Sequence, residues 1–355
     1  MLNERILPWF QTGVADAIFL TKLPNVRWTT GFKGADSSAL ITANGAFLIT
    51  DPRYTEQAEL ECPDITLVNW RATGGSMMKA VAHILKEQKL QSVAFEADAL
   101  SYERYTALKD ATDAELIPTT DVVEKLRSIK TPQEIQYLRN ACDISCRAFW
   151  RIVKDIRVGI TEKELAAKLS AYMVMEGADT QPYGNILISG PNTSLLHGIP
   201  SDRALQYGDF VLMDYGCQFN GYMSDMTRTV VVGKADAKQR EVYELEKRMI
   251  EDSIAVMKAG NTAGDVYEAS IQAIKDTEYL PYHYSGIGHG IGLFVHELPF
   301  MRPKGEHVFC PGTVTTIEPG LYIPGWGGVR IEDQILIAEN GNENMVSVPH
   351  DLIEL

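Results

Sequence analysis

The 355 residues carry a formal net charge of −14 at pH 7, from 47 acidic and 33 basic side chains. This length predicts two domains, and the acidic balance argues against a nucleic-acid groove and for a soluble protein. The first residues lack a basic segment followed by an apolar run, and no apolar stretch approaches the ~20 residues that span a bilayer. Five scattered cysteines without a CxxC pair favour a reduced compartment. We therefore expect a cytoplasmic protein that does not enter a membrane.

Residues 1–128 are expected to form a small α/β domain, because short apolar runs alternate with helical stretches. The apolar runs lie at 17–20, 39–41, 46–49 and 93–95, and the helices near 54–61, 75–88 and 101–111. Asp51 precedes Pro52 at one helix start and is expected to cap it. The pattern brings no set of His, Asp and Glu residues together, so we assign this domain no chemistry of its own.

Residues 129–355 are expected to form the second domain. Thr131 and Glu134 make a capping box at the start of its first helix, and Thr161 and Glu164 repeat the box before a second helix. A pair of strands follows, and the order helix, helix, hairpin then occurs again along the chain. This order indicates two halves that each supply one hairpin.

The stretch Phe210–Val232 predicts two strands joined at Asn220-Gly221, because Asn-Gly is the strongest short hairpin signal. With this turn Asp214 lies opposite Thr227, and Asp225 lies on the same face of the sheet. Two carboxylates thus converge from an apolar ladder, where they repel and cannot both stay ionised without a positive partner. A divalent metal is the first candidate for that partner.

A second pair of strands, Val314–Ile337, surrounds a glycine-rich turn and carries Glu318 on one arm and Glu332 on the other. Between the hairpins His289 stands among four glycines, which let backbone and ligand approach closely. Four carboxylates and one imidazole form a hard donor set that suits a pair of Mn²⁺, Co²⁺ or Zn²⁺ ions better than thiolate-bound zinc. Four carboxylates also balance the charge of two dications.

These residues stand in the motifs MDYG with YMSDMTRT, GHGIGL followed by VHE, TIEPG, and GVRIEDQ. In order and spacing the motifs resemble those of the pita-bread metallopeptidases, and among them the proline peptidases. The resemblance places the family's metal ligands on Asp214, Asp225, His289, Glu318 and Glu332. Adjacent strand residues face opposite ways, so only one of Glu332 and its neighbour Asp333 can face the metals, and the motif selects Glu332.

The resemblance implies an α/β (α+β) protein with a pita-bread domain at 129–355, in which the two halves are related by a pseudo-twofold axis. It implies two divalent ions, with Mn²⁺ expected first and Co²⁺ or Zn²⁺ as alternatives. The stretches TGFKGADSSALIT and FLITDPRYTEQA are similar to the entry domain of Xaa-Pro aminopeptidases.

The resemblance also gives roles to His197 and His296, which would contact the scissile carbonyl or the developing anion. The alternative for each is a hydrogen-bonded structural imidazole. Arg330 shares a strand face with Glu332, so it could bind a substrate carboxylate, hold a ligand, or form a plain salt bridge to Glu332. Many relatives carry a histidine four residues before the metal histidine, where this chain has Ser285, and this departure concerns the positioning of the substrate.

The activity that the resemblance implies is removal of the first residue from peptides with proline in the second position. Two ions would activate a water and polarise the carbonyl, Glu318 would carry the proton to the leaving nitrogen, and the two histidines would steady the tetrahedral intermediate. The expected partners are proline-containing peptides and a second copy of the chain in a homodimer, with no nucleic acid and no membrane.

Alternatives remain open at this point. An Xaa-Pro dipeptidase (prolidase) differs in whether the mouth of the cleft admits a long peptide, which no motif reports. Metal-free amidinohydrolases and non-catalytic peptide-binding modules use a similar fold, but they lack the full set of acidic ligands that is present here. A methionine aminopeptidase is disfavoured by the entire N-terminal domain.

Overall fold

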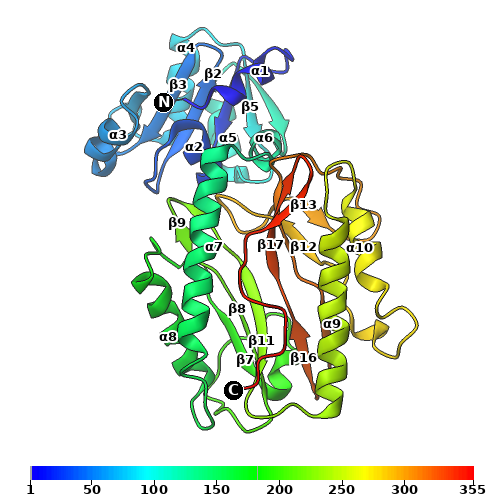
Figure 1. Ribbon diagram of the computed structural model, residues 1–355. Coiled ribbons are helices and arrows are strands. Elements are labelled where there is room, and N and C mark those ends of the chain that lie inside the picture. The colour runs from blue at the N-terminus through cyan, green and yellow to red at the C-terminus, as the bar shows by residue number, and fades with distance from the viewer. Residues whose placement is uncertain (1, 182) are drawn as a thin grey trace. The chain divides into compact units, whose positions relative to one another are not determined.

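The structure, a computed structural model, describes residues 2–181 and 183–355 (Figure 1). It contains two compact units, Met1–Arg127 and Ser128–Leu355. Helices and strands are mixed in both, which confirms the expected α/β class. Among the described helices, none combines the length and the apolarity that a membrane crossing requires. All five cysteines are free thiols.

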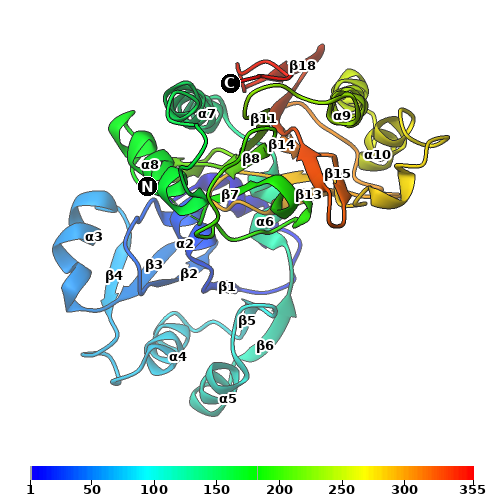
Figure 2. The same cartoon turned by 90° about the horizontal axis from the view of Figure 1, so that it is seen from below.

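The first unit contains the strands β1 (Ala17–Leu20), β2 (Ser38–Thr42), β3 (Gly45–Thr50), β4 (Thr66–Asn69), β5 (Ser92–Glu96) and β6 (Glu115–Thr119). They form one sheet in the order β4-β3-β2-β1-β5-β6 (Figure 2). β2 runs antiparallel to β1 and β3, whereas the pairs β1–β5, β5–β6 and β3–β4 are parallel.

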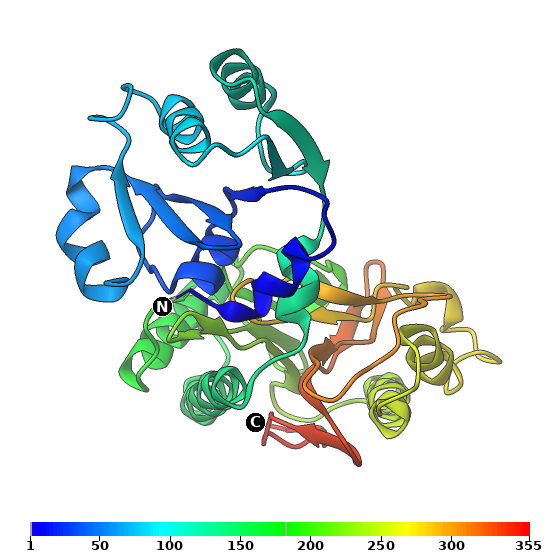
Figure 3. The same ribbon diagram turned by 90° about the horizontal axis from the view of Figure 1, so that it is seen from above.

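The helices of this unit are α1 (Leu7–Phe10), α2 (Leu23–Thr30), α3 (Thr55–Glu61), α4 (Met77–Glu87), α5 (Tyr102–Ala111) and α6 (Val122–Ser128), with 3₁₀ turns η1 (Glu4–Ile6) and η2 (Pro52–Tyr54). α4 and α5 lie side by side on one face of the sheet (Figure 3), where Val81 and Leu108 belong to the same buried cluster as Phe19 and Phe95. Asp51 caps η2 at the predicted helix start, because its carboxylate accepts a hydrogen bond from the backbone N–H of Arg53.

The apolar pattern does not predict α2, β4 or β6, and each omission has a physical reason. β4 and β6 are the edge strands, and most of their residues are partly exposed, so neither presents a continuous apolar run. α2 buries polar side chains instead: Asn25 and Thr29 are fully buried, and the Asn25 amide donates to Glu96. Tertiary contacts stabilise these elements, and local periodicity does not report such contacts.

The second unit opens with two helices, α7 (Pro132–Ile152) and α8 (Glu162–Met175), which begin with the predicted capping boxes. The hydroxyls of Thr131 and Thr161 accept from the N–H groups of Glu134 and Glu164, whose carboxylates accept from the N–H groups of the threonines. A second pair of helices, α9 (Ala237–Val256) and α10 (Ala263–Ile271), starts with capping boxes in the same way.

The strands of the first half of this unit are β7 (Ile186–Ser189), β8 (Phe210–Tyr215), β9 (Gln218–Phe219), β10 (Tyr222–Met223) and β11 (Met226–Val231), with the 3₁₀ turn η3 (Gly190–Ser194). Those of the second half are β12 (Gly288–Gly290), β13 (Glu297–Met301), β14 (Val314–Ile317), β15 (Gly320–Ile323), β16 (Gly327–Arg330), β17 (Asp333–Ala338) and β18 (Gly341–Asn344), with η4 (Leu280–Tyr282). The sheet orders are β11-β8-β7 and β13-β12-β14-β17-β18, beside the short ladders β9–β10 and β15–β16.

Each half has its own buried cluster. Phe149 and Leu169 of the first helix pair pack with Met213 of β8, and Val242 of α9 packs in a second cluster with Ile335 of β17. Figure 1 shows α7 and α8 on one side of the strands and α9 and α10 on the other. The repeat of helix, helix, hairpin is therefore present in space, and the hairpins meet between the two helix pairs.

Candidate metal centre

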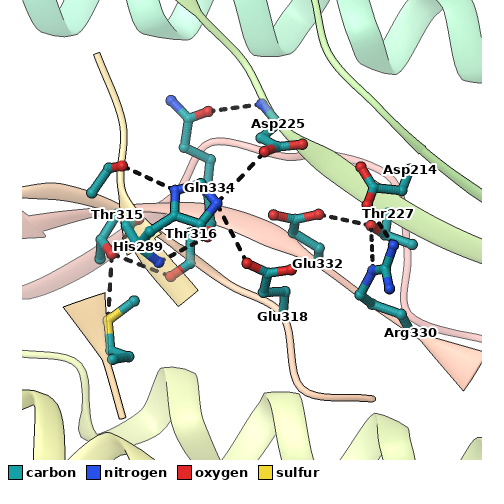
Figure 4. A network of polar contacts seen from close by, with 12 residues as sticks. Asp214, Asp225, Thr227, His289, Thr315, Thr316, Glu318, Arg330, Glu332 and Gln334 are labelled. Carbon is teal, nitrogen blue, oxygen red and sulfur yellow. Dashed lines mark hydrogen bonds and ion pairs between the residues drawn. The ribbon is translucent and has the colours of Figure 1, made fainter. Parts of the chain in front are cut away.

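The first hairpin has the register that the sequence predicts. Asp214 of β8 pairs with Thr227 of β11. The turn residues Asn220 and Gly221 have φ of 47° and 81°, the left-handed values that a type I′ turn requires. Asp225 precedes β11 and is 5% exposed. Figure 4 shows the carboxylates of Asp214 and Asp225 directed into the same enclosed region.

The second hairpin places Glu318 opposite Glu332. The ladders β14–β17 and β15–β16 share one register, and these two residues lie in the gap between them. The Thr227 hydroxyl donates to Oε2 of Glu332 at 2.7 Å, and the Glu332 N–H donates to the carbonyl of Thr227 at 3.0 Å. Asp333 faces away from this region, as the alternation of strand residues predicts, and binds Arg228.

His289 is held in β12 with its ring in a defined tautomer. The backbone N–H of His289 donates to the Thr316 hydroxyl at 3.2 Å, and the Thr315 hydroxyl donates to the backbone carbonyl of His289 at 2.8 Å. Nδ1 lies 3.0 Å from the carbonyl oxygen of Gly290. Because a carbonyl oxygen only accepts, Nδ1 carries the proton and Nε2 keeps a free lone pair, the arrangement of a metal-binding histidine. A Cβ at Gly290 would lie 2.1 Å from the Leu298 carbonyl oxygen, so this strand contact requires glycine.

The five predicted ligands gather in one cluster (Figure 4). Nε2 of His289 lies 3.7 Å from Oδ2 of Asp225 and 3.4 Å from Oε1 of Glu318. Asp225, His289 and Glu332 each offer a ligand atom within 4.8 Å of the others. Asp214 stands at the other end of the cluster, where Arg330 binds it.

The cluster is electrostatically strained without a cation. Burial raises the pKa of Asp225 and of Glu332 well above the usual range, and the neighbouring carboxylates raise both further. Burial also raises the pKa of Glu318 to about 7, although the Arg330 charge opposes this. The pKa of His289 is lowered, because burial disfavours its charged form. Carboxylates that repel one another in a dry site need a positive partner to ionise together.

The donor set fits divalent ions. Oε1 of Glu332 is buried and has no hydrogen-bond partner among the described residues, and such an oxygen is costly unless something binds it. The free lone pair of His289 and the converging carboxylates provide further donors around the same point. Mixed oxygen and imidazole donors suit Mn²⁺, Co²⁺ and Zn²⁺.

Arg330 holds Asp214. Its guanidinium donates to Asp214, to the Tyr322 hydroxyl at 2.8 Å and to the Thr227 hydroxyl at 3.2 Å, and the residue is 3% exposed. The plain salt bridge to Glu332, one of the three possibilities, is therefore wrong. The long side chain reaches across to β8 of the other hairpin, where Asp214 stands.

The cluster opens into a cavity of about 330 Å³, which both predicted histidines line. His197 is exposed on the loop after η3, and the His296 ring packs edge-on against the His289 ring with centroids 4.4 Å apart. Partial burial and the neighbouring histidines lower the pKa of His296. The apolar residues that line the cavity include Ile186, Leu196, Val295 and Phe300.

Two contacts to Asp225 are absent from the sequence-based predictions. The Tyr183 hydroxyl donates to its Oδ1 at 2.8 Å, and Oε1 of Gln334 accepts from its N–H at 3.3 Å. Gln334 stands two residues after Glu332, so strand alternation could have indicated it. Tyr183 comes from a separate loop that carries no local signal.

Comparison with known proteins agrees with this geometry. Residues 4–129 match the creatinase/prolidase N-terminal domain, and residues 136–339 match metallopeptidase family M24. An uncharacterized peptidase of Bacillus subtilis, YqhT, is 37% identical over 97% of both chains. The structure of an Xaa-Pro dipeptidase from Bacillus anthracis superposes with a TM-score of 0.95 at 38% identity, covering 99% of this chain and 98% of the other. An X-Pro aminopeptidase structure from Thermotoga maritima gives 0.88 at 31% identity, with coverage of 96% and 98%.

The chain is thus a metallopeptidase with the pita-bread fold, and it belongs to family M24. Within that family it stands in the group of Xaa-Pro dipeptidases and Xaa-Pro aminopeptidases. Membership confirms the predicted class of enzyme and implies the use of a divalent metal.

Proposed function

We propose that the protein is a dinuclear metallopeptidase that removes the N-terminal residue from peptides with proline in the second position. The observation that supports this most directly is the convergence of four carboxylates and the free Nε2 of His289 beside one cavity. The proposed ligands of two ions, Mn²⁺ first and Co²⁺ or Zn²⁺ as alternatives, are Asp214, Asp225, His289, Glu318 and Glu332. When bound, such a pair supplies an activated water and polarises the substrate carbonyl.

The surrounding side chains have proposed roles in moving protons and binding charge. Glu318 takes a proton from water and passes it to the leaving nitrogen. Its side chain is 23% exposed and lines the cavity, so its carboxylate can reach a bound water and the substrate. His197 and His296 bind the carbonyl oxygen as negative charge develops on it. Arg330 acts by holding Asp214.

Proline is selected by shape in this proposal. Its imide nitrogen lacks an N–H, so no hydrogen bond from that atom can distinguish it. The apolar residues that line the cavity have the right chemistry to contact the proline ring. Relatives named Xaa-Pro dipeptidase and X-Pro aminopeptidase support this substrate class. We also propose a homodimer, which light scattering would test.

The test is hydrolysis of Xaa-Pro dipeptides and Xaa-Pro-Xaa tripeptides by metal-depleted protein, with and without added Mn²⁺. We expect release of the first residue from tripeptides on addition of Mn²⁺ and loss of activity in chelator. Cleavage of dipeptides alone would identify an Xaa-Pro dipeptidase (prolidase) instead. Full activity in chelator, or equal activity on peptides without proline, would refute the proposal.

A further inference from the structure

A buried carboxylate, Glu162, lies at the base of the loop that carries His197. It is the first residue of α8 and is 0% exposed. Its Oε1 accepts from the N–H and hydroxyl of Ser189, at 2.7 and 2.8 Å, and from the Asn192 amide at 3.2 Å. Its Oε2 accepts from the N–H and hydroxyl of Ser201, at 2.9 and 2.7 Å. One carboxylate therefore binds both ends of a single loop, Ser189–Ser201.

Glu162 holds the two ends of this loop in place as an ionised carboxylate. Burial acts to raise its pKa, but the hydrogen bonds from Ser201 and Ser189 outweigh it and lower the pKa below the usual range, so the group is ionised at neutral pH. A negative charge in the first turn of a helix is also favoured by the helix dipole. The backbone N–H groups of Glu162 and Lys163 donate to the carbonyls of Arg203 and Ser201, which ties this end of α8 to the chain beyond the loop.

The middle of the loop is attached to the second hairpin. The Thr193 hydroxyl accepts from the N–H of Gly328 at 2.7 Å, and a Cβ at Gly328 would lie 2.4 Å from the Thr193 carbonyl oxygen. Nη1 of Arg330 lies 3.4 Å from the carbonyl oxygen of Leu196, the residue directly before His197. His197 is thus exposed at the cavity between one anchor at Leu196 and another at Ser201.

We propose that Glu162 is a positioning residue for the peptidase reaction, which acts through the loop Ser189–Ser201 and sets the place of His197 at the cavity. The inference rests on the proposed function, in which His197 contacts the substrate carbonyl. An exposed histidine on a loop without such anchors samples many positions. A misplacement of about 1 Å in a catalytic group costs roughly 10²-fold in rate.

The test compares two glutamates of the same helix end. Glu162→Gln keeps the size of the side chain but turns one acceptor into a donor that faces the donors of Ser189 or Ser201. Glu164→Gln makes the same chemical change at an exposed position, where glutamine still completes a capping box. We expect Glu162→Gln to lower kcat on an Xaa-Pro-Xaa peptide by about tenfold or more, with Mn²⁺ stoichiometry unchanged. Glu164→Gln should retain the wild-type kcat.

A double variant separates positioning from general loss of structure. If Glu162 acts through His197, then Glu162→Gln combined with His197→Ala should have the kcat of His197→Ala alone, within about twofold. The inference would be overturned if the double variant showed the product of the two single-variant losses in kcat, or if Glu162→Gln had the wild-type kcat. If Glu162→Gln does not fold, Ser201→Ala removes one donor to Glu162, the Ser201 hydroxyl, and keeps the backbone N–H; it is then carried through the same comparison. A wild-type protein that cleaves none of these peptides would instead refute the proposed function.

Discussion

Arg228 of β11 and Asp333 of β17 form an ion pair between the two halves of the metallopeptidase unit that solvent does not reach. Nη2 of Arg228 lies 2.7 Å from Oδ1 of Asp333, and the side chains are 1% and 0% exposed. Arg228 also donates to the backbone carbonyl of Glu332. The pair therefore joins the hairpins on the side of the strand opposite to the side chain of Glu332.

Removal of one partner of this ion pair should strongly destabilise the protein. Asp333→Asn leaves the Arg228 guanidinium buried without a counter-charge, and we expect a loss of about 3–5 kcal/mol in the free energy of unfolding, measured with urea. Glu343→Gln is the control, because it breaks a pair with Arg139 whose side chains are 42% and 39% exposed, and it should cost less than about 1 kcal/mol. Equal losses in the two variants would contradict the importance of burial.

Asp333 also has a predicted pH dependence. Burial acts to raise its pKa, but Arg228 and His350 outweigh burial and lower it. The stability from the pair is therefore present above the ordinary pKa of an aspartate and is lost as pH falls through the lowered value. Urea midpoints at descending pH should converge for the wild type and Asp333→Asn.

Asp225→Asn should abolish hydrolysis while the fold persists. It removes one charge from the centre of the cluster and leaves an amide where a carboxylate is proposed to bind metal. The metal-free variant should melt no lower than the metal-free wild type, because repulsion with Asp214 and Glu318 is relieved. The measurements are peptide turnover, bound metal and thermal unfolding, with Asp202→Asn at an exposed site as control. Full turnover by Asp225→Asn would refute the ligand assignment.

Metal should stabilise the protein most near neutral pH. In the metal-free chain the pKa of Glu318 rises from 4.5 to about 7, so the folded state binds more protons and loses stability as pH rises through that window. Bound metal offsets this loss, because it favours the ionised carboxylates. A ligand at 100 times its Kd adds ~2.7 kcal/mol per independent site to the free energy of unfolding. Melting curves with and without Mn²⁺ should differ near pH 7.5, and the gap should shrink near pH 5. No gap at neutral pH despite bound metal would show that the carboxylates do not converge.

A chain truncated to begin at Ser128 should still bind metal if it is soluble. All five proposed ligands lie in Ser128–Leu355, and the truncated chain keeps the bridge between Ile129 and Thr313. Metal stoichiometry of the purified fragment is the measurement. A folded fragment that binds no metal would place at least one ligand in residues 1–127.

Glu246→Gln should stabilise the protein. Glu246 in α9 is 0% exposed, its Oε2 has no partner among the described residues, and burial raises its pKa well above the usual range. Because its folded pKa is raised, wild-type stability falls as pH increases above the ordinary glutamate pKa. Glutamine removes that loss, so the free energy of unfolding of the variant should exceed that of the wild type by about 0.5–2 kcal/mol near pH 8 and by less near pH 5, as measured by urea unfolding. A gain in stability of Glu246→Gln over the wild type that increases as the pH falls would contradict this account.

The local geometry of the site could be predicted from short stretches of the chain. Asn220-Gly221 requires positive φ at both residues, and this turn sets the register that brings Asp214 opposite Thr227. Strand alternation then separates Glu332 from Asp333. Capping boxes mark the helix starts in the same way, because each depends on residues three positions apart.

Contacts between residues far apart in the chain could not be predicted from the sequence and are seen only in the folded protein. Arg330 reaches Asp214 rather than Glu332, Tyr183 binds Asp225 from a separate loop, and Glu162 closes a loop that starts 27 residues further along the chain. The edge strands β4 and β6 also formed without an apolar signal of their own. Turns and alternation act over a few residues and can be read along the chain, whereas these contacts depend on how distant segments pack together.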